Sequence, residues 1–375
     1  MSAPAPPGSV VFSLESPDAA ELEAMWRTLE ERADISFYLS WAWIGAWVAE
    51  AGMPDHVLVG RSGEEIVSLA LLRRGVQRRH GFVRSRTLYL HETGDEEKDI
   101  IFIEYNGFLT DRRFGRLEPQ GLAFLRSVGG FDEVQLGGMA EDGYEAVRTA
   151  GFRTSVHALK TTAFVDLEAI RAGGGDYLAT ISSNTRYQVR RALKIYESRG
   201  PVRLEPARDV AEALAFFDEL GTLHARAWEQ RGEGGGAWRF PFLIAFHRRL
   251  IEENFASGGI DIVRISCGGT AIGYIHCLVR EGWYGSYLSG FAYEADNKVK
   301  PGLVSFYLYI EERLKSGAKV LDFLAGDHRY KTSLGQPGPS LYWFRVQERR
   351  PQLMLESGLR WVKQRVKGSP AKSGG

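Results

Sequence analysis

Residues 260–314 read IDIVRISCGGTAIGYIHCLVREGWYGSYLSGFAYEADNKVKPGLVSFYLYIEERL, and the order of their parts decides the fold. Apolar and aromatic runs are interrupted at residues 267–270 and 280–282 by glycine-containing turns, a pattern that predicts an antiparallel meander. A polar loop at residues 293–300 then leads directly into Pro301 and an amphipathic helix. The strands of the meander are expected at residues 260–266, 271–280 and 283–292.

The segments on both sides of this stretch continue an α/β pattern. Towards the C-terminus a strand is predicted at residues 319–323, followed by a polar loop and a last strand at residues 341–346. Towards the N-terminus the pattern predicts a helix at residues 177–199 with a basic face, a strand at residues 202–205, and a long helix that Asp209 caps. The second half is therefore expected to be a mixed sheet with helices.

The first half of the chain has a similar alternation of elements. A strand at residues 10–14 and two helices precede a hairpin around the turn at residues 61–64. Polar side chains do not converge here, so we expect a sheet without a site of its own. Further strands are expected at residues 87–90, 100–105, 133–136 and 161–167.

Bulk composition limits the function classes. The 375 residues suit two domains, and 47 basic residues balance 47 acidic ones, so no global field attracts DNA or an anionic membrane. Cys267 and Cys277 are too few for a disulfide framework or a zinc site, which is typical of a reducing compartment. The sequence predicts neither a transmembrane helix nor a secretory signal. We expect a cytoplasmic protein that uses no metal.

A glycine-rich break at residues 172–175 separates the two halves. Successive glycines favour neither helix nor strand, so such a run is typical of a domain boundary. We expect a flexible tail at residues 1–9, a first domain at 10–170, a second domain at 171–350, and a C-terminal helix and flexible tail at 351–375.

The junction at residues 297–305 has the features of an anion site. A proline presets the first helical turn, a glycine lets a ligand approach the backbone, and exposed amides with the helix dipole attract negative charge. This arrangement predicts a site for a pyrophosphate-bearing cofactor; the alternative is a plain helix start with surface lysines. The candidate cofactor-binding residues are Lys298, Lys300, Pro301, Gly302, Leu303, Val304 and, on the preceding strand, Ser289.

A second polar group is the sequence DFLAGDHRYK at residues 322–331, where a predicted strand ends. We expect Asp327 or His328 to accept a proton from an attacking amine or hydroxyl, and Tyr330 to return one to a leaving thiolate. Lys331 would bind phosphate or an acidic acceptor. The alternative is an exposed turn in which Asp327 caps a helix.

Other candidates are single residues. His224 lies on the apolar stripe of its helix and His276 in the middle of a strand, so each is either catalytic or a packed core residue. Tyr287 and Ser289 alternate on the next strand, where they line a cleft or belong to the core. A glycine-rich loop at residues 232–236 predicts a mobile lid or an ordinary surface loop. The candidate substrate-binding residues are Arg186, Arg190, Trp228, Trp238, Tyr287 and Asp322.

Strands, an anion-binding loop, a helix and a further strand, in this order, resemble the GNAT acyltransferases. In that family the loop and helix after the fourth strand hold the pyrophosphate of acetyl-CoA, and the neighbouring strands splay apart to accept the pantetheine arm. The resemblance implies that residues 283–292 are the fourth strand and residues 319–323 the fifth. It also implies acetyl-CoA or another acyl-CoA as co-substrate.

A further set of short motifs is spread over residues 177–334: Ser183-Asn184-Thr185-Arg186, Arg190-Arg191, residues 224–228, Lys300-Pro301-Gly302-Leu303, Asp322-Phe323, Gly326-Asp327 and Tyr330-Lys331. This set is similar to the CelD/BcsL-type acetyltransferases associated with bacterial exopolysaccharide production, a branch similar to the Fem aminoacyl transferases. The resemblance implies an α/β (α+β) fold of tandem GNAT-like domains, each a mixed, mostly antiparallel sheet flanked by helices, with the first domain degenerate.

Together these features predict direct transfer of an acyl group from acyl-CoA to an amine or hydroxyl of a sugar-derived or other small acceptor, in exopolysaccharide or cell-envelope biosynthesis. A strand amide would polarise the thioester carbonyl. One alternative is a Fem-like transferase that uses aminoacyl-tRNA, supported by the basic helix unless that helix is simply a solvated face. Another alternative is a non-catalytic carbohydrate- or partner-binding module on the same scaffold.

Overall fold

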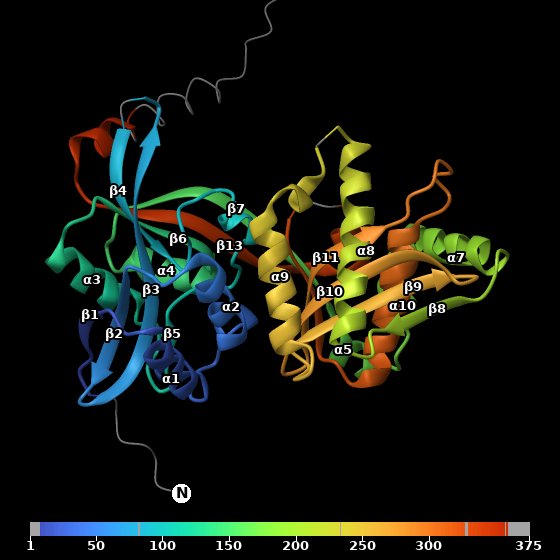
Figure 1. Ribbon diagram of the computed structural model, residues 1–375, viewed down its shortest axis with the longest axis horizontal. Helices are drawn as coiled ribbons and strands as arrows, with labels where there is room; N and C mark the ends of the chain where they lie inside the picture. The colour runs from blue at the N-terminus through green and yellow to red at the C-terminus, as the bar shows by residue number, and fades with distance from the viewer. Residues whose placement is uncertain (1–7, 82, 233, 327–328, 357, 359–375) are drawn as a thin grey trace, which may run out of the picture.

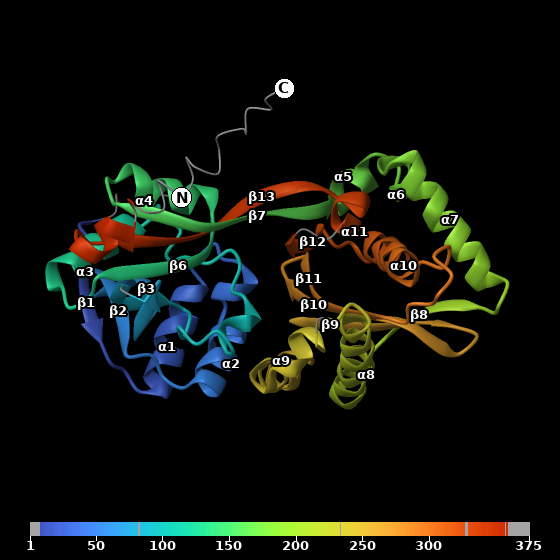
Figure 2. The same ribbon diagram turned by 90° about the horizontal axis from the view of Figure 1, so that it is seen from above.

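The computed structural model describes residues 8–81, 83–232, 234–326, 329–356 and 358. These residues form two lobes joined by a long two-stranded ribbon (Figures 1 and 2). The first lobe follows the order strand, two helices, three strands, helix, strand, helix, strand. Its elements are β1 (Val11–Glu15), α1 (Ala19–Glu30), α2 (Trp41–Ala51), β2 (His56–Ser62), β3 (Glu65–Arg79), β4 (Val83–Leu90), α3 (Glu118–Val128), β6 (Glu133–Ala140), α4 (Glu141–Thr149) and β7 (Thr154–Asp166).

The second lobe repeats this order after three connecting helices, so the chain contains an internal structural repeat. The connecting helices are α5 (Leu167–Ala172), α6 (Tyr177–Thr180) and α7 (Ser183–Glu197). The repeated elements are β8 (Val202–Pro206), α8 (Val210–Glu229), α9 (Pro241–Asn254), β9 (Ile260–Cys267), β10 (Thr270–Arg280), β11 (Trp283–Phe291), α10 (Pro301–Ser316), β12 (Val320–Ala325), α11 (Arg329–Leu334) and β13 (Gln336–Gln347).

All these strands belong to one sheet, in the order β1-β2-β3-β4-β6-β13-β7-β12-β11-β10-β9-β8. The last strand of each repeat crosses to the other lobe: β7 pairs with β12, and β13 pairs with β6. The two crossing strands also pair antiparallel with each other and form the ribbon seen in Figure 2. The lobes therefore share backbone hydrogen bonds as well as side-chain contacts. The short strand β5 (Leu109–Thr110) pairs with β3 beside this path.

One parallel pair in each lobe is short and then separates. In the first lobe, residues 87–89 of β4 pair with residues 133–135 of β6. In the second lobe, residues 283–285 of β11 pair with residues 320–322 of β12. Beyond these three pairs the strands of each couple diverge, so each lobe has a split in its sheet next to a helix start.

Helices close both faces of the sheet and bury three cores. Helices α1, α2, α8 and α9 share one core across the lobe boundary, where the rings of Trp43 and Phe246 meet with centroids 4.7 Å apart. Helix α10 covers the other face of the second lobe, and α3 and α4 cover that of the first. None of the described helices combines the length and apolar composition needed to cross a bilayer.

The predicted meander and the expected fold class are confirmed: β9, β10 and β11 pair antiparallel in order, and mixed sheets are flanked by helices. The strand expected at residues 100–105 is wrong. A single turn, η2 (Asp99–Ile101), and an irregular loop occupy it, because Phe102 and Tyr105 have positive φ angles of 31° and 48° that a strand does not allow. Their apolar neighbours Ile101 and Ile103 are nonetheless buried.

The single helix expected at residues 177–199 is also wrong, because the chain breaks it into α6 and α7. Ser182 adopts an extended conformation between them, and its hydroxyl oxygen accepts the Thr185 amide as the cap of α7. The glycine break follows α5, while β13 returns to the sheet of the first lobe. The domain limits near residue 170 stay a prediction.

Candidate functional site

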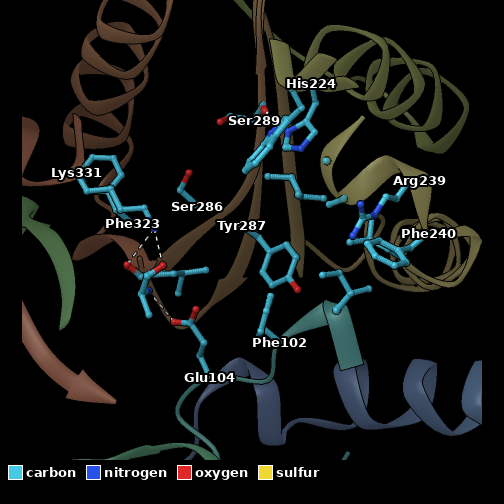
Figure 3. Close-up of a pocket in the computed structure, with 18 of the residues that line it drawn as sticks. Phe102, Glu104, His224, Arg239, Phe240, Ser286, Tyr287, Ser289, Phe323 and Lys331 are labelled. Carbon is cyan, nitrogen blue, oxygen red and sulfur yellow. Dashed lines mark hydrogen bonds between the residues drawn. The ribbon is translucent and has the colours of Figure 1, made fainter. Parts of the chain in front are cut away.

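A cavity of about 780 Å³ lies at the split between β11 and β12 (Figure 3). Its walls come from β11, β12, α8, α9, α11, the loop between α8 and α9, and a loop of the first lobe. The site is therefore formed by both lobes. The lining residues are Ile100, Phe102, Glu104, His224, Trp228, Gly232, Gly234, Gly236, Ala237, Arg239, Phe240, Leu243, Ser286, Tyr287, Leu288, Ser289, Phe323, Leu324, Ala325, Tyr330 and Lys331.

An irregularity in β11 explains why four consecutive residues of this strand reach the cavity. His276 of β10 pairs with Leu288 of β11, and the next residue, Cys277, pairs with Ser286. Tyr287 therefore has no opposite residue on β10. Such a bulge re-aims side chains and interrupts the ladder. The Tyr287 hydroxyl donates to the Ile101 carbonyl of the first lobe, which ties the bulge to the loop opposite.

The first-lobe loop that closes the cavity is fastened to β12. The Tyr105 hydroxyl donates to Oδ2 of Asp322 over 2.5 Å, and the Trp283 indole donates to the same oxygen over 3.3 Å. The other carboxylate oxygen of Asp322 accepts the Leu324 amide. Protein groups thus engage both carboxylate oxygens of Asp322, and Asp322 does not line the cavity. We therefore do not propose Asp322 as a substrate-binding residue.

Glu104 extends from this loop into the cavity (Figure 3). The Ala325 amide donates to its carboxylate over 2.9 Å, and only 7% of the residue is exposed. Burial raises the pKa of Glu104 to about 7, with a further rise from Asp322, while the Ala325 amide and the cations Lys331 and Lys160 oppose the rise. The sequence reasoning missed Glu104, although it is the one carboxylate in the apolar run IIFIEYNGF at residues 100–108.

Lys331 and Tyr330 are the two predicted catalytic residues of the 322–331 segment that line the cavity. The Lys331 ammonium donates to the carbonyls of Leu324 and Ala325 over 3.3 and 2.7 Å, and Leu324 adopts a positive φ of 62°. The Tyr330 ring stacks on Phe306 of α10 with centroids 5.3 Å apart. The other two, Asp327 and His328, lie outside the described residues.

The predicted lid forms the opposite wall. His224 lines the cavity and its Nδ1 lies 3.2 Å from the Ser289 carbonyl, while its ring contacts Trp238 with centroids 5.1 Å apart. Trp228 and three glycines of the 232–236 loop also line the wall, followed by the turn η3 (Gly236–Arg239). Trp238, a predicted substrate-binding residue, does not line the cavity, and its ring packs between those of His224 and Phe217.

His276 is buried in the core and does not line the cavity. It is 0% exposed, its ring meets that of His247 with centroids 5.3 Å apart, and burial lowers its pKa to about 3. Arg186 and Arg190 lie on α7, away from the cavity. These three predicted residues therefore take no part in the proposal below.

The predicted cofactor residues at the start of α10 lie beside the cavity rather than in its wall, apart from Ser289 of β11. The first turn of α10 has no side-chain cap and no acidic residue, and Lys298 and Lys300 precede it. Gly302 has a packing reason that the sequence did not suggest, because a Cβ there would lie 3.2 Å from the ring of Phe291. One turn further, Phe306 contacts Phe323 of the cavity wall.

Within the part of the chain that the structure describes, no group of three or more histidine, cysteine, aspartate or glutamate side chains is placed to hold a metal ion. The charged side chains among the described residues that line the cavity are Glu104, Arg239 and Lys331. The two cations can position a substrate, and the carboxylate can exchange a proton with it.

Residues 183–332 match the family model described as acetyltransferase (GNAT) domain. The match extends from the start of α7 into α11 and includes β11, β12 and α10. No curated protein matches the sequence. The match thus covers most of the second lobe, while the narrower CelD/BcsL type and its role in exopolysaccharide production stay predictions.

Solved structures share the whole two-lobed arrangement. FemX aligns with a TM-score of 0.55 at 13% identity, over 92% of this chain and 99% of its own. The C-terminal domain of a putative lysylphosphatidylglycerol synthetase from Agrobacterium fabrum aligns with a TM-score of 0.51 at 12% identity, over 96% and 99%. L-PGS from Bacillus licheniformis aligns with a TM-score of 0.52 at 14% identity, over 95% and 99%. At such identities the likeness extends to the fold alone.

Proposed function

We propose that the protein transfers an acyl group from acyl-CoA to an amine or hydroxyl of a sugar-derived or other small acceptor, within the cavity between β11 and β12. The observation that carries this proposal is the split itself. The two strands pair over three residues and then diverge around a cavity of about 780 Å³. The GNAT match covers this same segment. A cleft of this size suits a small-molecule ligand.

The start of α10 fits the diphosphate of such a donor. Its first amides lack intrahelical acceptors, and no side chain caps them. The helix dipole and the lysines at 298 and 300 favour an anion at this end. The bulge at Tyr287 supplies irregular backbone beside the split, where an amide can polarise a carbonyl. When bound, acyl-CoA would supply the activated acyl carbon.

The corresponding end of the first lobe does not fit a donor. Glu118 opens α3 with a carboxylate that is 1% exposed and accepts the Phe108 amide over 3.3 Å. Arg116 neutralises part of its charge at 3.3 Å. A carboxylate at this helix start occupies the place that an anionic ligand needs and repels it. This contrast supports one donor site per chain, in the second lobe, with the first lobe degenerate.

The acceptor would enter between α8 and the first-lobe loop. Aromatic side chains and a few polar groups alternate on that wall, a composition suited to the apolar faces and hydroxyls of a sugar-derived molecule. Arg239 adds a positive charge at the rim, next to Phe240. His224 and Ser289, which also line the cavity, contribute further hydrogen-bonding groups. These residues would orient the acceptor amine or hydroxyl towards the thioester.

Isothermal titration of the full chain with CoA and acetyl-CoA tests the donor assignment. We expect saturable binding that weakens with salt, because part of it is electrostatic. Replacing Glu118 by glutamine in the first lobe is the matched control and should leave CoA affinity unchanged. Absence of binding at millimolar CoA would overturn the proposal.

Two rival functions give different results in the same experiments. Salt-sensitive binding of aminoacyl-tRNA without CoA binding would favour a Fem-like donor and would direct attention to the basic face of α7. Binding of a saccharide without CoA binding or thiol release would favour a non-catalytic module. Each outcome is separate from the one expected for acyl-CoA.

A further inference from the structure

The split of the first lobe is closed by the protein's own chain. Asn106 is 3% exposed and lies between β4 and β6, where its side-chain amide donates to the Leu90 carbonyl over 3.3 Å and to the Gly137 carbonyl over 2.9 Å. Its backbone amide donates to the Gly138 carbonyl over 3.0 Å. One side chain thus bridges both diverging strands. Asn106 therefore occupies the position where the second lobe has its cavity, and the cavity of about 520 Å³ that Asn106 also lines in the first lobe extends towards Arg116 and Glu118.

Three further contacts hold the Asn106 side chain and its loop in place. Nδ1 of the buried His91 lies 2.8 Å from the Asn106 side-chain oxygen, which also accepts the Gly107 amide over 2.8 Å. Gly138 has a φ of 68°, and a Cβ at that position would lie 2.1 Å from the Ile103 carbonyl oxygen. Only glycine allows the loop to approach β6 so closely. The first lobe therefore holds the loop at residues 103 and 106, on both sides of Glu104 and Tyr105.

The tip of the loop between these two points is held by the second lobe. Tyr105, next to Asn106 in sequence, donates to Asp322 of β12, and Glu104 accepts the Ala325 amide just beyond it. The backbone at Tyr105 is in the left-handed region, with a φ of 48°, which is costly for a bulky residue unless its surroundings enforce it. The position of Asn106 in the first lobe thus sets where Glu104 lies in the cavity of the second lobe.

We infer that Glu104 is a catalytic residue that accepts the proton of the acceptor, and that Asn106 is a positioning residue for it. The inference rests on the proposed acyl transfer. In that step the acceptor nitrogen or oxygen forms a bond to the acyl carbon, the carbon–sulfur bond breaks, and the acceptor's proton passes to the Glu104 carboxylate. The thiolate leaves with the bonding pair and is protonated from solvent.

Several charged and titratable groups face Glu104. Lys331 on α11 and Lys160 on β7 favour its ionised form, and Asp322 on β12 disfavours it. The ionisation of Tyr38 in η1 (Phe37–Leu39) and of Tyr287 is in turn disfavoured by Glu104. With a pKa near 7, Glu104 is ionised above neutral pH, so the rate should fall as pH drops below about 7.

The decisive experiment compares Glu104→Gln with wild type by thiol release from acetyl-CoA, with glucosamine as acceptor and with water alone. We expect Glu104→Gln to lower kcat/KM about 100-fold or more and to abolish the acid limb of the pH profile, with CoA affinity unchanged by titration. Full activity with an unchanged acid limb would overturn the inference.

Glu92→Gln is the matched control. Glu92 is also buried in the first lobe, and burial raises its pKa to about 8, so it carries a proton at neutral pH as the amide does. Glu92→Gln should keep the acid limb of the pH profile. If Glu92→Gln lost this limb, the limb would belong to Glu92 and the inference would be overturned.

Asn106→Ala tests the positioning role. We expect a lower kcat and a displaced acid limb at unchanged CoA affinity, whereas a merely structural residue would lower only the yield of folded protein. An unmoved limb at wild-type kcat would overturn this role. If Asn106→Ala does not fold, Glu104→Asp is the second test, because it shortens the Glu104 side chain by one methylene. Glu104→Asp should retain the acid limb at a reduced kcat. A wild-type kcat in Glu104→Asp would count against the need for positioning.

If the proposed function is wrong, the wild-type protein gives different results in these experiments. No CoA binding and no thiol release in wild type would overturn acyl transfer itself. CoA binding without thiol release to glucosamine or water would leave the donor site standing and overturn the role of Glu104 as the base that activates a nucleophile in this cavity.

Discussion

Replacing His276 by leucine is expected to make the protein less sensitive to acid. His276 and His247 are both 0% exposed, and none of their four ring nitrogens has a hydrogen-bond partner within the described part of the chain. Burial lowers the pKa of His276 to about 3 and that of His247 well below 6.5. Both imidazoles are therefore neutral in the native protein at neutral pH.

The size and direction of the effect follow from proton linkage. In the unfolded chain His276 takes up a proton below its ordinary pKa of 6.5. In the native state it is protonated only when the pH is near 3. The unfolded state therefore gains protons as pH falls, and stability is lost by about 1.4 kcal/mol per pH unit for this residue. At one unit below 6.5 the loss is about 1.4 kcal/mol, and at two units about 2.7 kcal/mol.

Urea unfolding followed by tryptophan fluorescence measures this loss. Between about pH 7.5 and about pH 5.5, we expect His276→Leu to lose about 1.4 kcal/mol less unfolding free energy than wild type. Buried carboxyls with raised pKa values contribute equally to both proteins and cancel in the difference. Phe217→Leu is the control, because Phe217 contacts the His276 ring at 6.0 Å and does not titrate. Equal pH-dependent losses in wild type and His276→Leu would refute the reasoning.

Three further predictions concern the site. Tyr105→Phe removes the hydrogen bond to the Asp322 carboxylate and should lower the unfolding free energy by about 1.5–3 kcal/mol; an unchanged thermal midpoint would contradict it. Gly221→Ala puts a Cβ 1.9 Å from Nε1 of Trp238, so it should displace the lid and raise the acceptor KM while titration shows unchanged CoA affinity. Lys298→Ala should weaken CoA binding about threefold at low salt and less at high salt; equal affinity at both would exclude its phosphate role.

The local elements of the second lobe could be predicted because the signals are short-range. Turns at residues 267–270 and 280–282 place β9, β10 and β11, and Pro301 places the start of α10. The exchange of β7 and β13 has no such signal. Phe344 of β13 lies opposite Leu136 and Val156, which are distant in the sequence, and alternating side chains on a strand do not say which lobe it joins.

The site residues that could be predicted are those placed by the same short-range signals as the strands. Tyr330, Lys331, Tyr287 and Ser289 line the cavity because they follow or belong to the diverging strands. Glu104 was not predictable, because the run around it has the composition of a strand. The loop there depends instead on partners far along the chain: Gly138, which admits the backbone of residue 103, and β12, to which its tip is fastened.

These dependencies give the first lobe a physical role in the site of the second. Strand β12 is held on one side by only three residues of β11, and on the other by β7, which pairs Asp166 with Val320 and Phe164 with Asp322. The width of the split is therefore fixed as much by the first lobe as by the second. The same lobe fills its own cleft with Asn106 and sends Glu104 across the boundary. Under the proposed acyl transfer, a lobe without a donor site is still necessary, since without it the neighbouring cavity would lack one wall, its buried carboxylate and the strand β7 that pairs with β12.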